Sequence, residues 1–335
     1  MDAPLWTDAH APALADLPQT EAREYLEKAV SNPINLVLHG PPGSGKTAAV
    51  RALAREAHDD PDNDLVEINV ADFFGRTKTE IKNDPRFESF LVGKSDLSKR
   101  DMINHVLKES ASYAPVAGNY KTVVLDNAED IRIDFQQALR RVMEQYHKTT
   151  QFVICTRQPT KLIPPIRSRC FPVSMRAATN EETVAVLRHI VEAEGVAYED
   201  AGLEFVAGYA EGDLREAILA TQTVHATEGE VTMQSAYETI GDVGDEETIQ
   251  SMLDDAESGE FQDARKTLDD LLVDEGYSGN EVLDSVLRVA RKRYSGDRLA
   301  KLHELAGEID VEMNTGTSDR VHLSHLLAEL GRDSL

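Results

Sequence analysis

A glycine-rich run near the start of the chain has the spacing of a phosphate-binding loop. It follows the short apolar stretch 35–38, precedes the helix-forming stretch 48–57, and reads His39-Gly40-Pro41-Pro42-Gly43-Ser44-Gly45-Lys46-Thr47. This is G-x-x-x-x-G-K-[ST] between a strand and a helix, the context that the motif requires. The glycines allow backbone N–H groups to surround phosphate oxygens, and the new helix directs the positive end of its dipole at them. Lys46 would contact the β- and γ-phosphates, and the Thr47 hydroxyl would hold Mg²⁺. The run therefore predicts a site for a nucleoside triphosphate.

A carboxylate at the end of an apolar strand is the second candidate for this site. The run Val123-Val124-Leu125-Asp126 lies downstream of the loop. In folds with such a loop, an Asp in this place holds Mg²⁺, directly or through water, opposite the hydroxyl of the loop. Many apolar strands end in Asp, so the complete loop upstream gives the pattern its weight. We expect Asp126 and Thr47 to share one metal site.

Apolar stretches that alternate with helical patterns indicate the fold that positions these residues. The strand candidates are 35–38, 65–70, 122–126, 151–155 and 171–174. The middle ones are continuous apolar runs, as expected of buried parallel strands. Between and before them lie the helical patterns 20–30, 102–112 and 134–146, so the chain predicts an α/β fold with a parallel sheet and right-handed crossovers. The polar stretch 73–99 is interpreted as an insertion.

The strand signal ends after about residue 176, and helical patterns continue to the end of the chain. Helices are expected at 181–194 and 214–227, with Asp213 capping the second and Glu216 closing a capping box. The Gly- and Asp-rich run 241–245 predicts a boundary. Amphipathic helices follow at 248–258, 261–274, 280–294, 298–313 and 320–330. We therefore predict a nucleotide-binding α/β domain at 1–175, a helical lid at 176–241 and an all-α domain at 242–335.

The charge of the chain is strongly acidic and unevenly distributed. The formal charge is −25, with a net −2 over residues 1–175 and a net −23 over residues 176–335. Within the first part, residues 131–169 carry eight basic side chains against two acidic ones. Only 13 lysines beside 60 acidic residues fit a protein from a salty cytoplasm. The local basic segment favours a different role, contact with a polyanion.

The sequence also argues against several classes of protein. The first residues lack the basic and apolar regions of a secretory signal, and no stretch approaches the roughly 20 apolar residues of a membrane span. Cys155 and Cys170 fit no zinc spacing, and two thiols of this kind are typical of a reducing compartment. We expect a cytoplasmic protein.

Three further runs resemble a known family. They are Thr122-Val-Val-Leu-Asp-Asn-Ala-Glu-Asp130, Gln136-Gln-Ala-Leu-Arg-Arg-Val-Met-Glu144 and Ile166-Arg-Ser-Arg-Cys170. Together they resemble an AAA+ clamp-loader subunit, most closely the small subunit of archaeal and eukaryotic replication factor C. The triplet Ser168-Arg169-Cys170 is the most discriminating of these marks. The segment 212–218 is similar to the sensor 2 helix of the family, and the segments 307–310 and 319–323 resemble the end of its collar domain.

The resemblance implies a fold, an activity and a set of partners. The fold would be an AAA+ P-loop NTPase with a helical lid and an all-α collar, which binds ATP and Mg²⁺. The subunit would join a pentameric hetero-oligomer with large and small clamp-loader subunits, which opens a sliding clamp and places it on primer–template DNA. Arg215 would reach the nucleotide from the lid, and Arg169 would act as an arginine finger on a neighbour's ATP. Lys99, Arg100 and Arg132 would contact DNA from the starts of helices that line the spiral.

Several positions depart from the family's pattern. Asn127 occupies the place of a Glu that polarises the attacking water, and Asn cannot accept a proton from that water. Glu129 stands at a position that is usually Asp, and Arg157 aligns with sensor 1, which is usually a small polar residue such as Asn. Near the start, Trp6-Thr7-Asp8-Ala9-His10-Ala11-Pro12 lacks both cations of the family's motif.

These departures leave alternatives open. The chain is interpreted either as a motor subunit or as a non-catalytic scaffold that binds ATP and donates Arg169. A different AAA+ machine, such as a branch-migration helicase, is disfavoured by Ser168-Arg169-Cys170 and by the collar-like end.

Overall fold

The chain divides into two compact units, residues 1–236 and 237–335. The computed structural model describes residues 4–70, 76–82, 91, 97–116, 118–240, 246–274, 276–315 and 318–332. The predicted boundary at 241–245 and most of the predicted insertion at 73–99 lie outside the described residues, so the three-domain division stays a prediction.

A five-stranded parallel sheet forms the centre of the first unit. Its strands are β1 (Leu36–His39), β2 (Leu65–Asn69), β3 (Lys121–Asp126), β4 (Thr150–Thr156) and β5 (Phe171–Ser174). The strand order is β2-β3-β4-β1-β5, and every neighbouring pair is parallel. The predicted α/β fold with a parallel sheet is confirmed.

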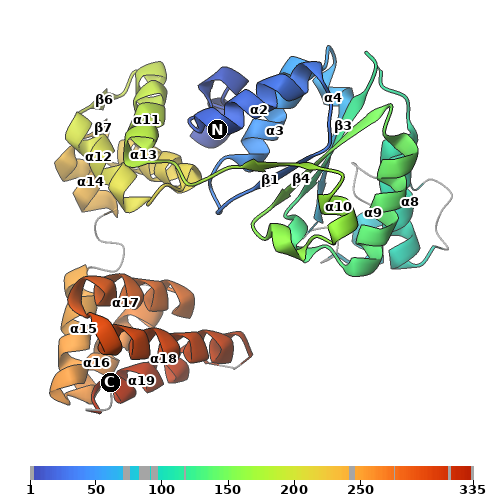
Figure 1. The fold of residues 1–335 in the computed structure, drawn as a ribbon. Helices are drawn as coiled ribbons and strands as arrows, with labels where there is room; N and C mark the ends of the chain where they lie inside the picture. Colours follow the sequence, from blue (N-terminus) through green and yellow to red (C-terminus); the bar gives the residue numbers. More distant parts are fainter. Residues whose placement is uncertain are drawn as a thin grey trace. The chain divides into compact units, whose positions relative to one another are not determined.

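Helices cover both faces of this sheet (Figure 1). Helices α2 (Thr20–Ser31) and α3 (Lys46–Ala57) pack on one face, and α8 (Lys99–Ser112) and α9 (Ile133–Tyr146) pack on the other. Because successive side chains of a strand point to opposite faces, Leu36 and Leu38 join the first core while Val37 joins the second. The sheet is therefore buried on both sides, as its continuous apolar runs predict.

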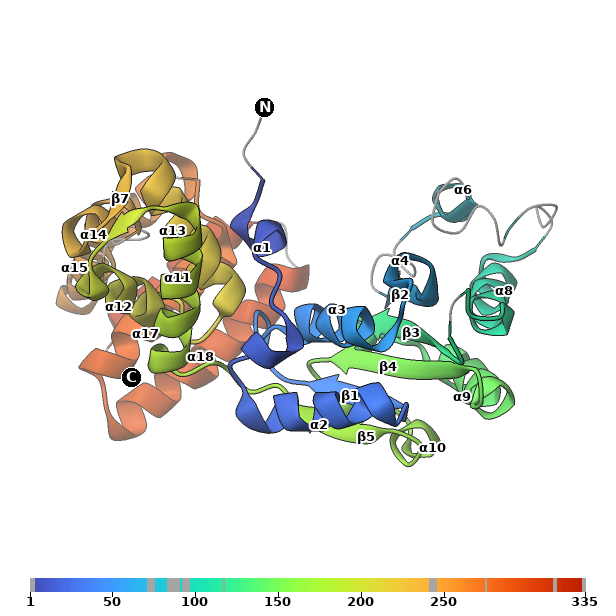
Figure 2. The same cartoon turned by 90° about the horizontal axis from the view of Figure 1, so that it is seen from above.

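The rest of the first unit is mostly helical. It contains α11 (Asn180–Glu194), α12 (Asp200–Tyr209) and α13 (Leu214–Glu228), and α14 (Met233–Ile240) follows. The Asp213 side chain accepts a hydrogen bond from the Glu216 N–H, which is the Asp213 half of the predicted capping box. The short N-terminal helix α1 (Trp6–Ala9) lies beside α13 (Figure 2). The backbone N–H of Trp6 donates to the side-chain oxygen of Gln222.

The prediction that strands end after residue 176 is wrong in one detail. The strands β6 (Ala197–Tyr198) and β7 (Glu230–Val231) pair in parallel beside these helices. Each has two residues, too few to show the alternation by which a strand is recognised in sequence.

The second unit is helical throughout its described residues. Its helices are α15 (Glu246–Ser258), α16 (Phe261–Asp269), α17 (Gly279–Arg293), α18 (Gly296–Thr315) and α19 (Asp319–Leu330). They enclose one apolar core that includes Leu253, Leu268, Val286, Leu302 and Leu326. The single helix predicted at 261–274 is instead α16 followed by a π-helical turn, Asp270–Asp274. No helix in the described ranges is long and apolar enough to span a membrane.

Candidate functional site

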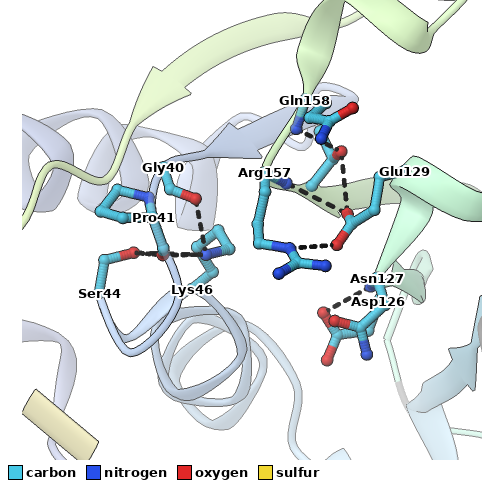
Figure 3. Close-up of polar contacts among 10 residues, drawn as sticks. Gly40, Pro41, Ser44, Lys46, Asp126, Asn127, Glu129, Arg157 and Gln158 are labelled. Atoms are coloured by element: carbon cyan, nitrogen blue, oxygen red, sulfur yellow. Dashed lines mark hydrogen bonds and ion pairs between the residues drawn. The ribbon is translucent and has the colours of Figure 1, made fainter. Parts of the chain in front are cut away.

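The glycine-rich loop connects β1 to α3 at the carboxyl end of the sheet. Gly43 and Gly45 have φ angles of 61° and 85°, in the left-handed region where side chains other than hydrogen are disfavoured. The Lys46 ammonium lies inside the loop, where it donates to the carbonyl oxygens of Gly40 at 3.0 Å and Pro41 at 2.6 Å (Figure 3). Burial lowers the pKa of Lys46, and the carboxylates of Asp126 and Glu129 oppose that shift. The loop thus presents backbone N–H groups and one cation at a helix start.

Thr47 and Asp126 meet at the entrance of α3. The Thr47 hydroxyl donates to a carboxylate oxygen of Asp126 at 2.8 Å. A hydroxyl and a carboxylate are oxygen ligands of the kind that Mg²⁺ prefers. In the ranges described above, no group of three or more His, Cys, Asp or Glu side chains could hold a metal ion. The donor set therefore fits a Mg²⁺ ion that also takes oxygens from phosphate and water.

A cavity of about 1320 Å³ extends from the loop. It is lined by the loop from Pro42 to Thr47, by the ends of β3 and β4, and by α11 and α13. Asp126, Asn127 and Arg215 all line it, so these predicted site residues lie around one space. The Arg215 side chain is exposed and makes no hydrogen bond or ion pair within the described part of the chain.

The lid side of the cavity contacts the loop directly. The Leu214 N–H, at the start of α13, donates to the Gly43 carbonyl at 3.1 Å. The buried Gln19 amide donates to the carbonyl oxygens of Ser44 at 3.0 Å and Arg176 at 3.1 Å, and so joins the loop to the chain after β5. Gln19 was not predicted, because an amide in front of a helix gives no signal of its long-range partners.

Glu129 and Arg157 form an ion pair at the cavity. The Arg157 Nε donates to Glu129 Oε1 at 2.6 Å, and the Arg157 N–H and the Thr156 hydroxyl both donate to Oε2 at 3.2 Å. Burial alone would raise the pKa of Glu129, but these hydrogen bonds hold it below its ordinary value. The sequence singled out both residues as departures without predicting that they pair.

Asn127 lies in the left-handed region, with φ 53° and ψ 46°, directly after β3. Asn is tolerated there better than most residues. Its backbone N–H donates to the other carboxylate oxygen of Asp126 at 2.9 Å. The backbone at position 127 thus helps to fix Asp126, while the side chain supplies an amide where a base would be needed.

Arg169 lies at the opposite end of the sheet, just before β5. Its guanidinium donates to the Pro165 carbonyl at 2.7 Å and to Glu144 at 2.5 Å. It is not part of the cavity lining. Strands β1 and β5 are parallel neighbours, so their amino ends lie at the same edge of the sheet. The glycine-rich loop follows the carboxyl end of β1, and Arg169 therefore lies at the opposite edge from the loop.

The predicted DNA-contacting residues lie near the starts of α8 and α9, away from the cavity lining. Arg100 and Arg132 are both highly exposed, and both pair with Asp134, at 3.2 Å and 3.5 Å. For Lys99, the structure describes the backbone but not the side chain. The two arginines thus come together around one carboxylate, and their contact with DNA stays a prediction.

The sheet, the loop and the helices that follow define an AAA-type ATPase. Residues 36–176 match the model of the "ATPase family associated with various cellular activities (AAA)", and residues 245–329 match the "Replication factor C C-terminal domain". A solved structure of the Thermotoga maritima RuvB Holliday junction branch migration motor aligns with a TM-score of 0.54 at 17% identity, covering 89% of this chain and 83% of that one. At that identity the likeness shows the fold alone.

Two curated relatives are both described as small subunits of replication factor C. The replication factor C small subunit of Halobacterium salinarum is 32% identical over 88% of this chain and 85% of its own length. That of Staphylothermus marinus is 33% identical over 97% of this chain and 94% of its own length. The chain belongs to the replication factor C small-subunit family.

Proposed function

We propose that this chain is an ATP-binding subunit of a clamp loader, which places a sliding clamp on primer–template DNA together with large and small partner subunits. The arrangement around the cavity is the observation that supports this most strongly. The loop lysine, the Thr47–Asp126 pair and Arg215 line one space, while Arg169 lies at the other end of the sheet. Such a chain can bind one nucleotide itself and present a cation to the nucleotide of a neighbour.

Each side chain has a distinct role in this proposal. Lys46 and the loop N–H groups bind phosphate, and Thr47 and Asp126 orient the metal ion. Bound Mg²⁺ would neutralise charge that develops on the phosphates. Arg215 contacts the nucleotide from the lid, and Arg169 stabilises charge across a subunit interface. Arg100, Arg132 and Lys99 contact the DNA backbone without reading its sequence.

Loss of the loop lysine tests the nucleotide site directly. We expect Lys46→Ala to abolish most binding of Mg²⁺–ATP, because it removes a cation from the phosphates. Lys148→Ala, which changes an exposed lysine in the turn after α9, is the matched control. The measurement is equilibrium titration of the purified chain with nucleotide. Equal affinities in wild type and Lys46→Ala would refute the proposed site.

A second function, an ATP-binding scaffold that hydrolyses slowly, is favoured by two observations. Asn127 supplies no base, and the Glu129 carboxylate is already occupied by three hydrogen bonds. Steady-state ATPase activity of the purified chain, with and without partner subunits, DNA and clamp, separates the two functions. A motor subunit turns over its own ATP in the complex, whereas a scaffold contributes only through the sites of its neighbours.

A further inference from the structure

The N-terminal segment, residues 4–12, forms part of the wall of the cavity. Its residues 5 and 7–12 line the space, which the lid helices α11 and α13 and the glycine-rich loop also line. In both views of the fold this segment lies between α13 and the helices α2 and α3 (Figure 1, Figure 2). The segment thus lies where the lid helices and the α/β part of the chain meet around one cavity.

Trp6 attaches this segment to α13. The side chain is buried, and its ring stacks on the His225 ring with 5.7 Å between the two centroids. The Trp6 N–H donates to the Gln222 Oε1 at 2.9 Å, and the Gln222 Nε2 donates back to the Pro4 carbonyl at 3.1 Å. A large apolar surface and a pair of hydrogen bonds therefore fix the start of the segment to the lid.

A second attachment joins His10 to α11. The His10 Nε2 donates to a carboxylate oxygen of Glu194, the last residue of α11, at 2.5 Å. Both side chains keep some contact with solvent, and exposed pairs of this kind contribute little to the stability of a fold. This pair matters by its position, because it joins the N-terminal segment to a lid helix across the edge of the cavity.

The same segment is attached to the α/β part of the chain two residues after His10. The Pro12 carbonyl accepts a hydrogen bond from the Arg55 guanidinium, on α3, at 2.6 Å. Leu14 and Leu17 are then buried in the core between the sheet and the helices α2 and α3. Two residues of extended chain span at most about 7 Å. The lid helices therefore cannot move far from α3 while both attachments persist.

We propose that residues 4–12 act as a strap that controls nucleotide exchange, because the lid helices can move away from the loop only after the strap detaches from α11 and α13. The proposal rests on the proposed function, since a nucleotide must first bind in the cavity. The strap contacts join protein groups to one another, so their loss favours the open state of the cavity with and without nucleotide. A ligand shifts an equilibrium between two states only through a difference in affinity. The strap should therefore set the rates of nucleotide entry and release and leave the affinity nearly unchanged.

Nucleotide exchange kinetics test the strap. Association and dissociation rate constants of the full chain would be measured with a fluorescent analogue of Mg²⁺–ADP. We expect Trp6→Ala to raise both rate constants about tenfold, the scale for losing an aromatic contact and a buried side chain. Glu194→Ala should raise both about two- to fivefold, the scale for an exposed ion pair. The dissociation constant should change by less than about twofold in each variant.

Glu192→Ala is the matched control, because it also removes a carboxylate from the end of α11. Glu192 accepts a hydrogen bond from the Tyr198 hydroxyl at 2.8 Å, a contact within the lid, and it lies outside the cavity lining. Both rate constants of this variant should equal those of wild type. Thermal unfolding is the folding control for Trp6→Ala, and Glu194→Ala, a change at the surface, decides the test if Trp6→Ala does not fold.

The combination of the two rate constants distinguishes a strap from a residue that merely contacts the nucleotide. Loss of such a contact would raise the dissociation rate constant alone and weaken the affinity. That pattern in Trp6→Ala and Glu194→Ala, or rate constants equal to those of wild type in both, would overturn the inference. A wild-type chain that binds no nucleotide would instead refute the proposed function.

Discussion

Charged side chains have different surroundings at the two ends of the parallel sheet. At the carboxyl ends, Asp126 and Arg157 face a cavity large enough for a nucleotide. At the amino ends, Lys121 begins β3 with only 3% of its surface exposed, its ammonium 5.9 Å from the centre of the Tyr113 ring, and Asp64 is 1% exposed in front of β2. One end keeps charge available for a ligand, and the other encloses it with groups of the protein. Ligand sites of open parallel sheets lie in the crevice at the carboxyl ends of the strands.

Arg169 belongs to the amino end of the sheet by position, but its surroundings differ from those of Lys121. The Phe171 N–H donates to the Asn35 carbonyl at 2.8 Å, which aligns the start of β5 with the start of β1. The Arg169 guanidinium remains partly exposed beside Glu144. Exposed ion pairs contribute little to stability, so this arginine can exchange its carboxylate for a phosphate at low cost. The comparison predicts that the ends of the sheet act on different nucleotides.

Arg169→Ala tests this division with the largest expected effect. The ATP affinity of the isolated chain should stay nearly unchanged, while hydrolysis by the assembled complex should fall about 10³-fold, because an arginine finger acts only across an interface. Arg140→Ala is the matched control, since Arg140 also pairs with Glu144 at 3.0 Å. ATPase activity and clamp loading of complexes built with each variant would be compared. Unaltered activity after Arg169→Ala contradicts the assignment.

Asn127→Glu tests the carboxyl end, with a smaller effect. A carboxylate beside Asp126 could orient and polarise water, a role worth at least about 10² in rate. Because Glu129 already holds Arg157, we expect a gain from this change alone. Single-turnover hydrolysis would be measured in complexes whose other subunits carry disabled loop lysines.

Asn127→Gly is the control for that experiment, because it keeps the left-handed backbone without adding a carboxylate. If wild type already hydrolyses ATP as fast as the Glu variant, Asn127 supports hydrolysis in place of Glu. That result would refute the proposed scaffold function.

The enclosed charge at the amino end predicts a pH dependence of stability. Burial lowers the pKa of Lys121 from 10.5 to about 8, so between these values the unfolded chain binds more protons than the folded one. The free energy of unfolding should therefore rise with pH from about 8 to 10.5, by on the order of 1–3 kcal/mol. Lys121→Met should be more stable at pH 7.5 and lack this rise. Urea unfolding of wild type and Lys121→Met at pH 7.5 and 10 measures this difference. An equal change in the free energy of unfolding of both proteins would show that Lys121 does not contribute to the pH dependence.

The parts of the structure that have a local residue pattern could be predicted from the sequence. The stretches 35–38 and 151–155 correspond to β1 and β4 because a doubly covered strand needs a continuous apolar run. The glycine-rich loop is recognisable because its backbone geometry requires glycine at fixed positions. The proximity of the loop to Asp126 could be expected because, in folds with such a loop, an Asp at the end of a strand lies opposite the hydroxyl of the loop.

Contacts between distant side chains could not be predicted in this way. The partners of Gln19, Glu129 and Arg169 depend on how separate elements pack, and a single sequence carries no periodic signal for them. Glu129 and Arg157 could be flagged as unusual one at a time, but their pairing at 2.6 Å needs the register of β3 against β4.

The exposed charged residues at the starts of α8 and α9 give the smallest expected effect, a change in DNA affinity. Asp134 pairs with both Arg100 and Arg132, so it orients two guanidinium groups and also competes with DNA phosphates for them. Arg132→Ala should weaken DNA binding by the assembly modestly, without sequence preference, and reduce the salt slope by about one. Asp134→Asn should have the opposite effect on affinity, and Arg188→Ala, on α11, should have none. DNA titrations over a range of salt concentrations measure all three, at high salt if the source is halophilic, where counterion release contributes less. An unchanged slope for Arg132→Ala would mean that Arg132 is only a solvated charge and that the basic segment 131–169 contacts DNA elsewhere.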